Sequence, residues 1–169
     1  SEMCIRDSHK LAQKDIDARW TKKNDETHYG YKNHVKVDAD SKIITNYATT
    51  SANIHDSNEF SEFLGEDDKV IYADSAYVGK EIPKHVENRI CEKGYRGKPL
   101  TDEQKESNRR KSKIRCRIEH VFGFITVSMH GLTVRSIGIK RAEFNIGLTN
   151  LVYNFCRYTI LKRKEVYMG

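Results

Sequence analysis

The chain has 169 residues, of which 37% are apolar and 32% are charged, and its formal net charge is +6. No stretch approaches about 18 uncharged apolar residues and only two prolines occur, which excludes a membrane-spanning protein and a low-complexity linker. Residues 80–117 hold 13 Lys and Arg against six Asp and Glu, so the basic excess lies in one segment, a pattern typical of proteins that bind a polyanion.

The N-terminal 27 residues are interpreted as two segments outside the main domain. Residues 1–8, SEMCIRDS, do not fit the rest of the chain and are interpreted as a non-native scar, with a natural protein that is longer at this end. Residues 9–27 are polar and predict an extended or partly ordered lead-in. The four cysteines lack the spacing of a zinc site or a disulfide framework, so we expect reduced thiols.

Residues 28–49 predict an antiparallel hairpin. Apolar and polar residues alternate in HYGYKNHVKVD, and DADS supplies turn residues before the second run, KIITNYATT. A helix is expected to begin at Asp56 or Ser57, because Phe60, Phe63 and Leu64 share one helical face.

The middle of the chain predicts a buried central strand over residues 70–73, which ends at Asp74. A short helix is expected around residues 80–90, and GYRGKPL is expected to be a loop or an edge strand.

Two longer helices are predicted in the C-terminal half. The first begins with a capping box, Thr101 to Gln104, and continues to about residue 128. Its apolar stripe consists of Ile114, Ile118, Val121, Phe122 and Ile125. The second runs from about 140 to 161, ahead of a tail at 162–169. We expect its core stripe to be Phe144, Leu148, Leu151, Val152 and Phe155.

Two carboxylates stand out as candidates for chemistry. Asp74 lies at the carboxyl end of a strand, where functional groups gather in open α/β sheets, although a turn or capping role is the alternative. Glu119 lies beside the apolar stripe of its helix, with Arg115 one turn earlier, although a surface ion pair is the alternative. Carboxylates so placed can hold hard divalent cations, and two such ions can drive phosphoryl transfer.

Several ordered motifs resemble bacterial insertion-sequence transposases of the Asp-Asp-Glu type. They are HYGYKNHVKVD, ANIHDS, YADSAY, GYRGKPLTDEQKESNRRKSKIR, RCRIEHVFG and NLVYNFCRY. The resemblance implies an α/β, RNase H-like mixed sheet flanked by helices, with residues 28–161 as the C-terminal portion of the catalytic domain. It also implies DNA transposition with Mg²⁺ or Mn²⁺, double-stranded DNA as partner, a homodimer in the full-length protein, and a bacterial cytoplasmic, nucleoid-associated location.

The resemblance assigns site residues motif by motif. Asp74 matches the second catalytic Asp, Glu119 the catalytic Glu, and Arg115 a supporting Arg. The family's first Asp has no match here, and Asp15 and Asp17 are the nearest candidates. We therefore expect a fragment that lacks its first strand and is inactive alone; the alternative is that Asp17 is the first Asp. The wider pattern's Tyr and Lys are replaced by Ser112 and Thr126.

The residues expected to contact DNA phosphates are Lys98, Arg109, Arg110, Lys111, Lys113 and Arg117. The alternative function is a non-catalytic DNA-binding remnant.

Overall fold

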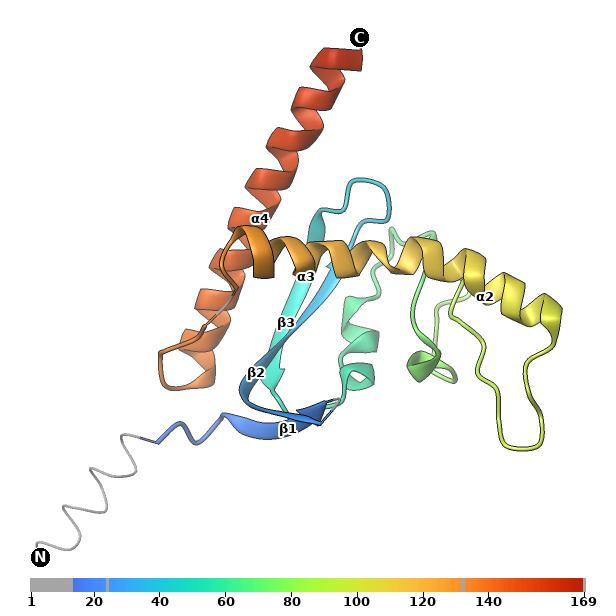
Figure 1. Cartoon of the computed structure of the whole chain (residues 1–169), viewed down its shortest axis with the longest axis horizontal. Helices are drawn as coiled ribbons and strands as arrows, with labels where there is room; N and C mark the ends of the chain where they lie inside the picture. The colour runs from blue at the N-terminus through green and yellow to red at the C-terminus, as the bar shows by residue number, and fades with distance from the viewer. Residues whose placement is uncertain (1–13, 24, 132, 169) are drawn as a thin grey trace, which may run out of the picture.

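The computed structural model describes residues 14–23, 25–131 and 133–168, which form an antiparallel sheet, a short parallel pair and three α-helices (Figure 1). The proposed scar at residues 1–8 lies outside the described residues. Strands β2 (Glu26–Val37) and β3 (Ile44–Ser51) pair from Tyr31 opposite Ser51 to Val37 opposite Ile44, with a bulge between Lys36 and Val37. The predicted hairpin is therefore confirmed.

The end of the lead-in is extended, as predicted, and it also belongs to the sheet, which the sequence did not indicate. Residues Arg19–Lys23 form strand β1, which pairs antiparallel with the first half of β2, so the sheet order is β1-β2-β3. The rings of Trp20 and Tyr29 lie directly opposite each other with centroids 4.9 Å apart. Such cross-strand aromatic pairs stabilise a two-stranded ladder, which explains how a polar segment forms a strand here.

The predicted buried strand at 70–73 is short and half-exposed. Strand β4 (Val70–Ile71) pairs in parallel with β5 (Glu87–Asn88), and Cys91 N–H donates to Ala73 O at 3.1 Å. Val70 is 39% exposed, because β5 is the one strand that pairs with β4 in the described part of the chain. The prediction of a helix around 80–90 was wrong, because this segment contains turns and strand β5.

The helix expected after Asp56 appears as two 3-10 turns, η1 (Asp56–Asn58) and η2 (Phe60–Phe63). Phe60 is buried, and its ring lies 5.1 Å from that of Tyr77 in a third turn, η3 (Ser75–Tyr77). These turns place Asp56 beside β2, where its carboxylate lies 3.3 Å from Lys32 Nζ.

The helix predicted at 101–128 is divided into α2 (Asp102–Arg115) and α3 (Arg117–Ser128). The capping box is confirmed, because Gln104 N–H donates to Thr101 Oγ1 and Thr101 N–H donates to Gln104 Oε1. Cys116 stays in the right-handed helical region at the junction, so α2 and α3 continue in nearly the same direction (Figure 1).

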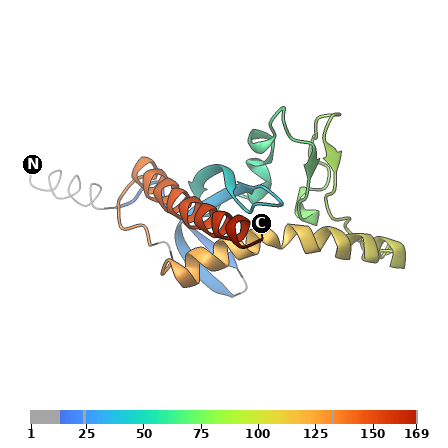
Figure 2. The ribbon, with the colours of Figure 1, turned by 90° about the horizontal axis from the view of Figure 1, so that it is seen from above.

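The hydrophobic core lies between α3, α4 (Ile139–Met168) and one face of the β2–β3 hairpin (Figure 2). Its buried residues are Ile44, Val121, Ile125 and Tyr153, with Val35, Val37, Phe124 and Met129 packed against them. Two members of the predicted stripe, Val121 and Ile125, are thus confirmed as core, whereas Phe122 is 37% exposed.

The prediction of which face of α4 is buried was wrong. Phe144, Leu148, Leu151, Val152 and Phe155 are all exposed, whereas Ala142, Ile146, Asn150 and Tyr153 are buried. The buried face is more polar because it binds the hairpin by hydrogen bonds. Asn150 and Asn33 exchange two amide bonds of 2.8 and 3.1 Å, and Asn154 pairs with both backbone groups of Ile44. The helix also continues past the expected end at 161, to Met168.

The described residues form a mixed α/β fold in which β2 has a free stretch of edge. Over residues 31–37, β2 pairs with β3, and among the described residues no strand lies on its other edge.

Cys91, Cys116 and Cys156 are free thiols. Within the part of the chain that the structure describes, no helix is long and apolar enough to cross a membrane.

Candidate functional site

Asp74 is exposed and lies three residues after the end of β4, at the N-terminus of η3. Its carboxylate accepts a hydrogen bond of 2.6 Å from the backbone N–H of Ser75, so it caps this turn. The ladder between β4 and β5 continues to Ala73, which fixes the backbone immediately before Asp74. One carboxylate oxygen therefore has a structural partner, in keeping with the alternative of a capping role for this residue.

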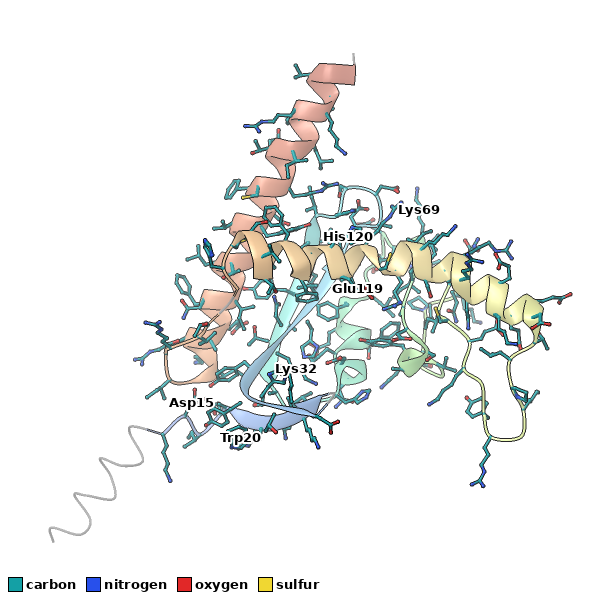
Figure 3. The ribbon with its side chains drawn as sticks, in the orientation of Figure 1. Asp15, Trp20, Lys32, Lys69, Glu119 and His120 are labelled. Carbon is teal, nitrogen blue, oxygen red and sulfur yellow. The ribbon has the colours of Figure 1, made fainter. Side chains whose placement is uncertain are left out.

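Glu119 lies in the first turn of α3, and its side chain is 61% exposed. Its Oε1 is 3.3 Å from Nη2 of Arg115, which is the last residue of α2. Figure 3 labels Glu119 and its neighbour His120 in the middle of the long α2–α3 rod. Arg115 and Glu119 thus share one face, as predicted, and form the exposed ion pair that is the alternative to a functional role.

No complete metal site is formed by the described residues. Among them, no group of three or more His, Cys, Asp or Glu side chains lies close enough to hold an ion. Hard cations such as Mg²⁺ take several oxygen ligands, so the described residues alone do not form such a site.

The six basic residues expected to contact DNA divide into two groups. Lys98, Arg109, Arg110 and Lys113 are exposed, the last three on α2. Arg109 has a loose ion pair with Glu106 at 3.9 Å, with a side chain that is 76% exposed. These four side chains are open to solvent and available to phosphates.

The other two basic residues hold parts of the fold together. Lys111 is 16% exposed and donates a hydrogen bond of 3.0 Å to the backbone O of Ile90, beside Glu92 at 3.7 Å. Arg117 donates to the backbone O of Ala39 and lies 3.2 Å from Asp40. Lys111 therefore ties α2 to the segment after β5, and Arg117 ties α3 to the hairpin loop.

Asp15 and Asp17, the nearest candidates for a first catalytic Asp, bind backbone at the start of α4. The Asp17 carboxylate accepts a hydrogen bond of 3.0 Å from the N–H of Ile139, the first residue of that helix. The Asp15 carboxylate accepts the Tyr31 hydroxyl at 2.7 Å and the Gly138 N–H at 3.2 Å. Burial acts to raise the pKa of Asp15, but these hydrogen bonds prevail and lower it. Both carboxylates thus have structural partners.

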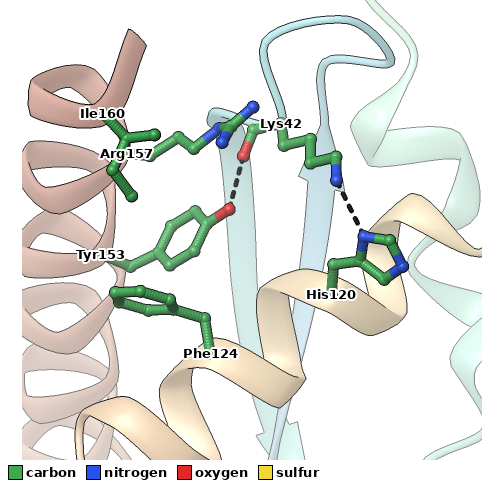
Figure 4. A pocket seen from close by; sticks show the side chains of 6 residues that line it. All are labelled: Lys42, His120, Phe124, Tyr153, Arg157 and Ile160. Carbon is green, nitrogen blue, oxygen red and sulfur yellow. Dashed lines mark hydrogen bonds between the residues drawn. The ribbon is translucent and has the colours of Figure 1, made fainter. Parts of the chain in front are cut away.

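A small basic pocket, which no pattern in the sequence indicated, lies between the hairpin loop, α3 and α4. It has a volume of about 140 Å³, and it is lined by Lys42, His120, Phe124, Tyr153, Arg157 and Ile160 (Figure 4). Lys42 Nζ lies 2.8 Å from Nδ1 of His120. Desolvation, followed by the nearby charges of Arg157 and Arg117, lowers the pKa of Lys42. Only tertiary contacts bring these residues together, since they come from three separate segments of the chain.

The sequence is similar to those of known proteins. A family model described as a transposase DDE domain matches residues 4–155. The transposase for insertion sequence element IS1106 of Neisseria meningitidis serogroup B is 36% identical over 117 residues, which cover 65% of this chain and 40% of that relative. The chain therefore spans less than half the length of this curated relative. No solved structure matches the chain.

Proposed function

The chain belongs to the DDE transposase family, and we propose that it carries two carboxylates of a metal-dependent DNA-cleaving site, Asp74 and Glu119. The placement of these residues supports the proposal, since Asp74 follows β4 by three residues, Glu119 lies in the first turn of α3, and both are exposed. The reaction is transposition: hydrolysis of a phosphodiester at an insertion-sequence end, followed by attack of the freed 3′-hydroxyl on target DNA.

The donor chemistry of these residues fits Mg²⁺ or Mn²⁺, because both ions prefer oxygen ligands and the two carboxylates offer them. A metal bound there would activate water and stabilise negative charge on the phosphate. Asp74 and Glu119 would hold the ion, with the capped Asp74 offering its second oxygen. Arg115 would orient the Glu119 carboxylate through their ion pair.

We propose that a first Asp, from a segment upstream of this chain, completes the triad. Two free strand edges support this proposal: β2 lacks a second neighbour over residues 31–37, and β4 has only β5 among the described strands. A strand that pairs with both edges would join the two small sheets into the mixed sheet of an RNase H-like fold. Asp17 is a weaker candidate, because its carboxylate binds the N–H of Ile139.

The DNA partner would be held by the exposed basic side chains Lys98, Arg109, Arg110 and Lys113. Phosphate contacts from Lys and Arg supply most of the affinity of proteins that bind DNA without sequence preference. Lys111 and Arg117 would act indirectly, because each is bound to the backbone of another segment.

Nicking of a supercoiled plasmid tests the cleavage function, with the protein expressed from a reading frame that includes the upstream segment. Asp74→Ala and Glu119→Gln are each expected to abolish Mg²⁺-dependent nicking while DNA binding persists, since Gln keeps the shape of Glu but loses its charge. Glu103→Gln, an exposed acid in the first turn of α2, is the matched control and should nick normally. Normal nicking by Asp74→Ala would overturn the assignment.

A DNA-binding remnant without catalysis is the second candidate. It is supported by the absence of a three-ligand metal cluster among the described residues. Titration calorimetry of this chain with Mn²⁺ is expected to show weak binding, because two carboxylates leave an ion short of ligands. If the longer protein binds DNA but never nicks it with Mg²⁺ or Mn²⁺, the remnant is the correct function.

A further inference from the structure

The small pocket between the hairpin loop, α3 and α4 gathers basic side chains and no acid. Its lining has a basic side and an apolar side, formed by Lys42, His120 and Arg157 and by Phe124, Tyr153 and Ile160 (Figure 4). In the described part of the chain, neither Lys42 nor Arg157 forms an ion pair. Cations that are held together without a carboxylate are typical of a site that binds an anion.

Like charges repel one another within this basic group. Burial lowers the pKa of Lys42 most, and the positive charges of Arg157 and Arg117 lower it further. Two acids on the neighbouring segments have other partners. Asp40 Oδ1 lies 3.2 Å from Nη1 of Arg117, and Glu119 Oε1 lies 3.3 Å from the guanidinium of the last residue of α2. A bound anion would therefore relieve a repulsion at Lys42 that these carboxylates leave in place.

Both cations keep N–H groups that no described atom accepts. The Lys42 ammonium has three donors and gives one to Nδ1 of His120 at 2.8 Å. The Arg157 guanidinium has five donors, and its Nε donates to the backbone O of Ser41 at 2.6 Å. The remaining donors of these two side chains have no acceptor within the residues that the structure describes. A ligand with several acceptor oxygens would satisfy them.

The backbone of Lys42 is fixed before any ligand binds. Its φ of 60° lies in the left-handed region, which residues other than glycine rarely adopt. The Tyr153 hydroxyl donates to the Lys42 carbonyl at 2.9 Å. In all, three side chains of α3 and α4 donate to carbonyls of this loop: Arg117, Tyr153 and Arg157. The pocket is therefore preorganised, which lowers the cost of ordering on binding.

The apolar side of the pocket indicates that the anion carries carbon. The rings of Phe124 and Tyr153 meet edge to face with centroids 5.7 Å apart, and Ile160 lines the pocket with them. An inorganic anion would contact only the basic side, whereas an ester would also cover apolar surface. The volume of about 140 Å³ limits the ligand to a small group.

We propose that this pocket binds a sugar phosphate group, with the phosphate on Lys42 and Arg157 and the sugar carbons against Phe124. A phosphate suits these cations, because the guanidinium can bind two of its oxygens while the ammonium acts as a point charge. Two sources carry this chemistry: a free sugar phosphate, and one unit of a nucleic-acid backbone. The site needs no metal and does not depend on the cleavage function or on the basic residues of α2.

Titration calorimetry of the 169-residue chain with 2-deoxyribose 5-phosphate, in EDTA and low salt, tests the site. The wild type is expected to bind one equivalent with a dissociation constant of about 1 mM, as suits so small a ligand. Lys42→Met should weaken binding at least about 10-fold, whereas Lys42→Arg keeps the charge and should bind within about twofold of the wild type. Lys84→Met, at an exposed lysine before β5, is the matched control and should bind normally.

A tetrathymidylate without terminal phosphates separates the two sources. If it displaces the sugar phosphate and binds Lys42→Met more weakly than the wild type, the pocket holds a nucleic-acid backbone. If it binds both proteins equally while the sugar phosphate still requires Lys42, the pocket holds a free sugar phosphate. Both results support the site and differ only in the source of its ligand.

Nuclear magnetic resonance of the histidine rings locates the bound ligand. The ring signals of His120, assigned with His120→Gln, should shift on saturation because its Nδ1 contacts Lys42, whereas those of His28, exposed on β2, should stay in place. A shift of His28 without one of His120 would overturn the proposed location. No binding by the wild type at about 20 mM ligand, or equal binding by Lys42→Met and Lys84→Met, would overturn the site itself.

Discussion

Arg115 Nη2 lies 3.3 Å from Glu119 Oε1 across the junction where α2 ends and α3 begins. The glutamate is 61% exposed and the arginine 29% exposed, so solvent screens the pair and its contribution to stability is about 0–1 kcal/mol. The ion pair mainly fixes the position of the Glu119 carboxylate, because the guanidinium restrains a side chain that would otherwise sample several rotamers in water. Function should therefore depend on Arg115 more than stability does.

The first prediction concerns this pair. In the protein expressed with the proposed upstream segment, Arg115→Ala should slow Mg²⁺-dependent plasmid nicking about 10-fold, less than Glu119→Gln, because Arg115 would position the proposed metal ligand and would not bind the metal itself. The free energy of unfolding, measured in urea, should change by no more than about 1 kcal/mol. Arg115→Lys keeps the charge but loses the forked geometry, so it should nick at an intermediate rate. An unchanged rate in Arg115→Ala would contradict the positioning role.

The second prediction concerns phosphate contacts on α2. Replacing Arg110 and Lys113 with Ala should reduce the slope of log affinity against log salt by about 1.8, since each lost contact removes about 0.9. Fluorescence anisotropy with one duplex at several salt concentrations measures the slope. Arg163→Ala with Lys164→Ala removes the same charge from exposed residues of α4 and should leave the slope unchanged. Equal slopes for both double variants would mean that α2 does not contact DNA.

The third prediction separates Lys111 from its basic neighbours. Lys111→Ala should lower the free energy of unfolding by about 1.5–3 kcal/mol, because it removes a charged donor from the buried side of α2 and leaves the Ile90 carbonyl without that partner. The control is Lys105→Ala, whose exposed ion pair with Asp102 is worth less than about 0.5 kcal/mol. Similar stabilities for the two variants would show that Lys111 is a surface residue.

Local patterns in the sequence predicted the elements that local interactions determine. The hairpin follows from strict alternation, and the start of α2 follows from a capping box whose two hydrogen bonds are both present. The sequence also placed Arg115 and Glu119 on one face, because residues four apart on a helix are neighbours. None of these predictions required knowledge of the tertiary fold.

Predictions that depended on burial were wrong where polar contacts decide the packing. Hydrophobicity selected Phe144 and Phe155 as the buried face of α4, yet that helix docks through the amides of Asn150 and Asn154. The close approach of α4 to β3 also needs Gly147, where an added Cβ would collide with the ring of Tyr47. Sequence periodicity cannot reveal which of two apolar faces meets a sheet.

The sequence also could not predict the contacts that basic residues of the site make with distant segments of the chain. Lys111 and Arg117 belong to the basic segment, and composition alone cannot distinguish them from Arg110. Their partners, Ile90 and Ala39, lie in other segments and offer backbone carbonyls, which carry no signal in the sequence. Tertiary structure was needed to assign these two side chains to the fold.

The fourth prediction is a pH dependence that arises at Asp15. Its carboxylate accepts hydrogen bonds from the Tyr31 hydroxyl and from the N–H groups of Asp17, Ala18 and Gly138, and so links β2 to the segment before α4. Burial raises the pKa of Asp15, but these donors outweigh burial, and the folded-state pKa lies below its ordinary value of 3.8.

The sign of the effect follows from proton binding. Because the pKa of Asp15 is lower in the folded state, the unfolded chain binds more protons as the pH falls toward that range. The stabilisation is therefore complete above the unfolded pKa of about 4 and is lost as the pH falls through the folded pKa. Asp15→Asn, which cannot ionise, should be less stable than the wild type by about 1–2 kcal/mol at pH 7, and the difference should shrink below pH 4.

Urea unfolding at pH 7, 5, 4 and 3 measures the free energy of unfolding of the wild type and of Asp15→Asn at each pH. Asp67→Asn, at an exposed acid before β4, is the matched control and should follow the wild type at every pH. Tyr31→Phe removes one donor and should reproduce part of the loss at pH 7, because the carboxylate keeps its backbone partners. A wild type and an Asp15→Asn variant that differ equally at pH 7 and pH 3 would show that the Asp15 side chain stabilises α4 by its shape and not by its charge.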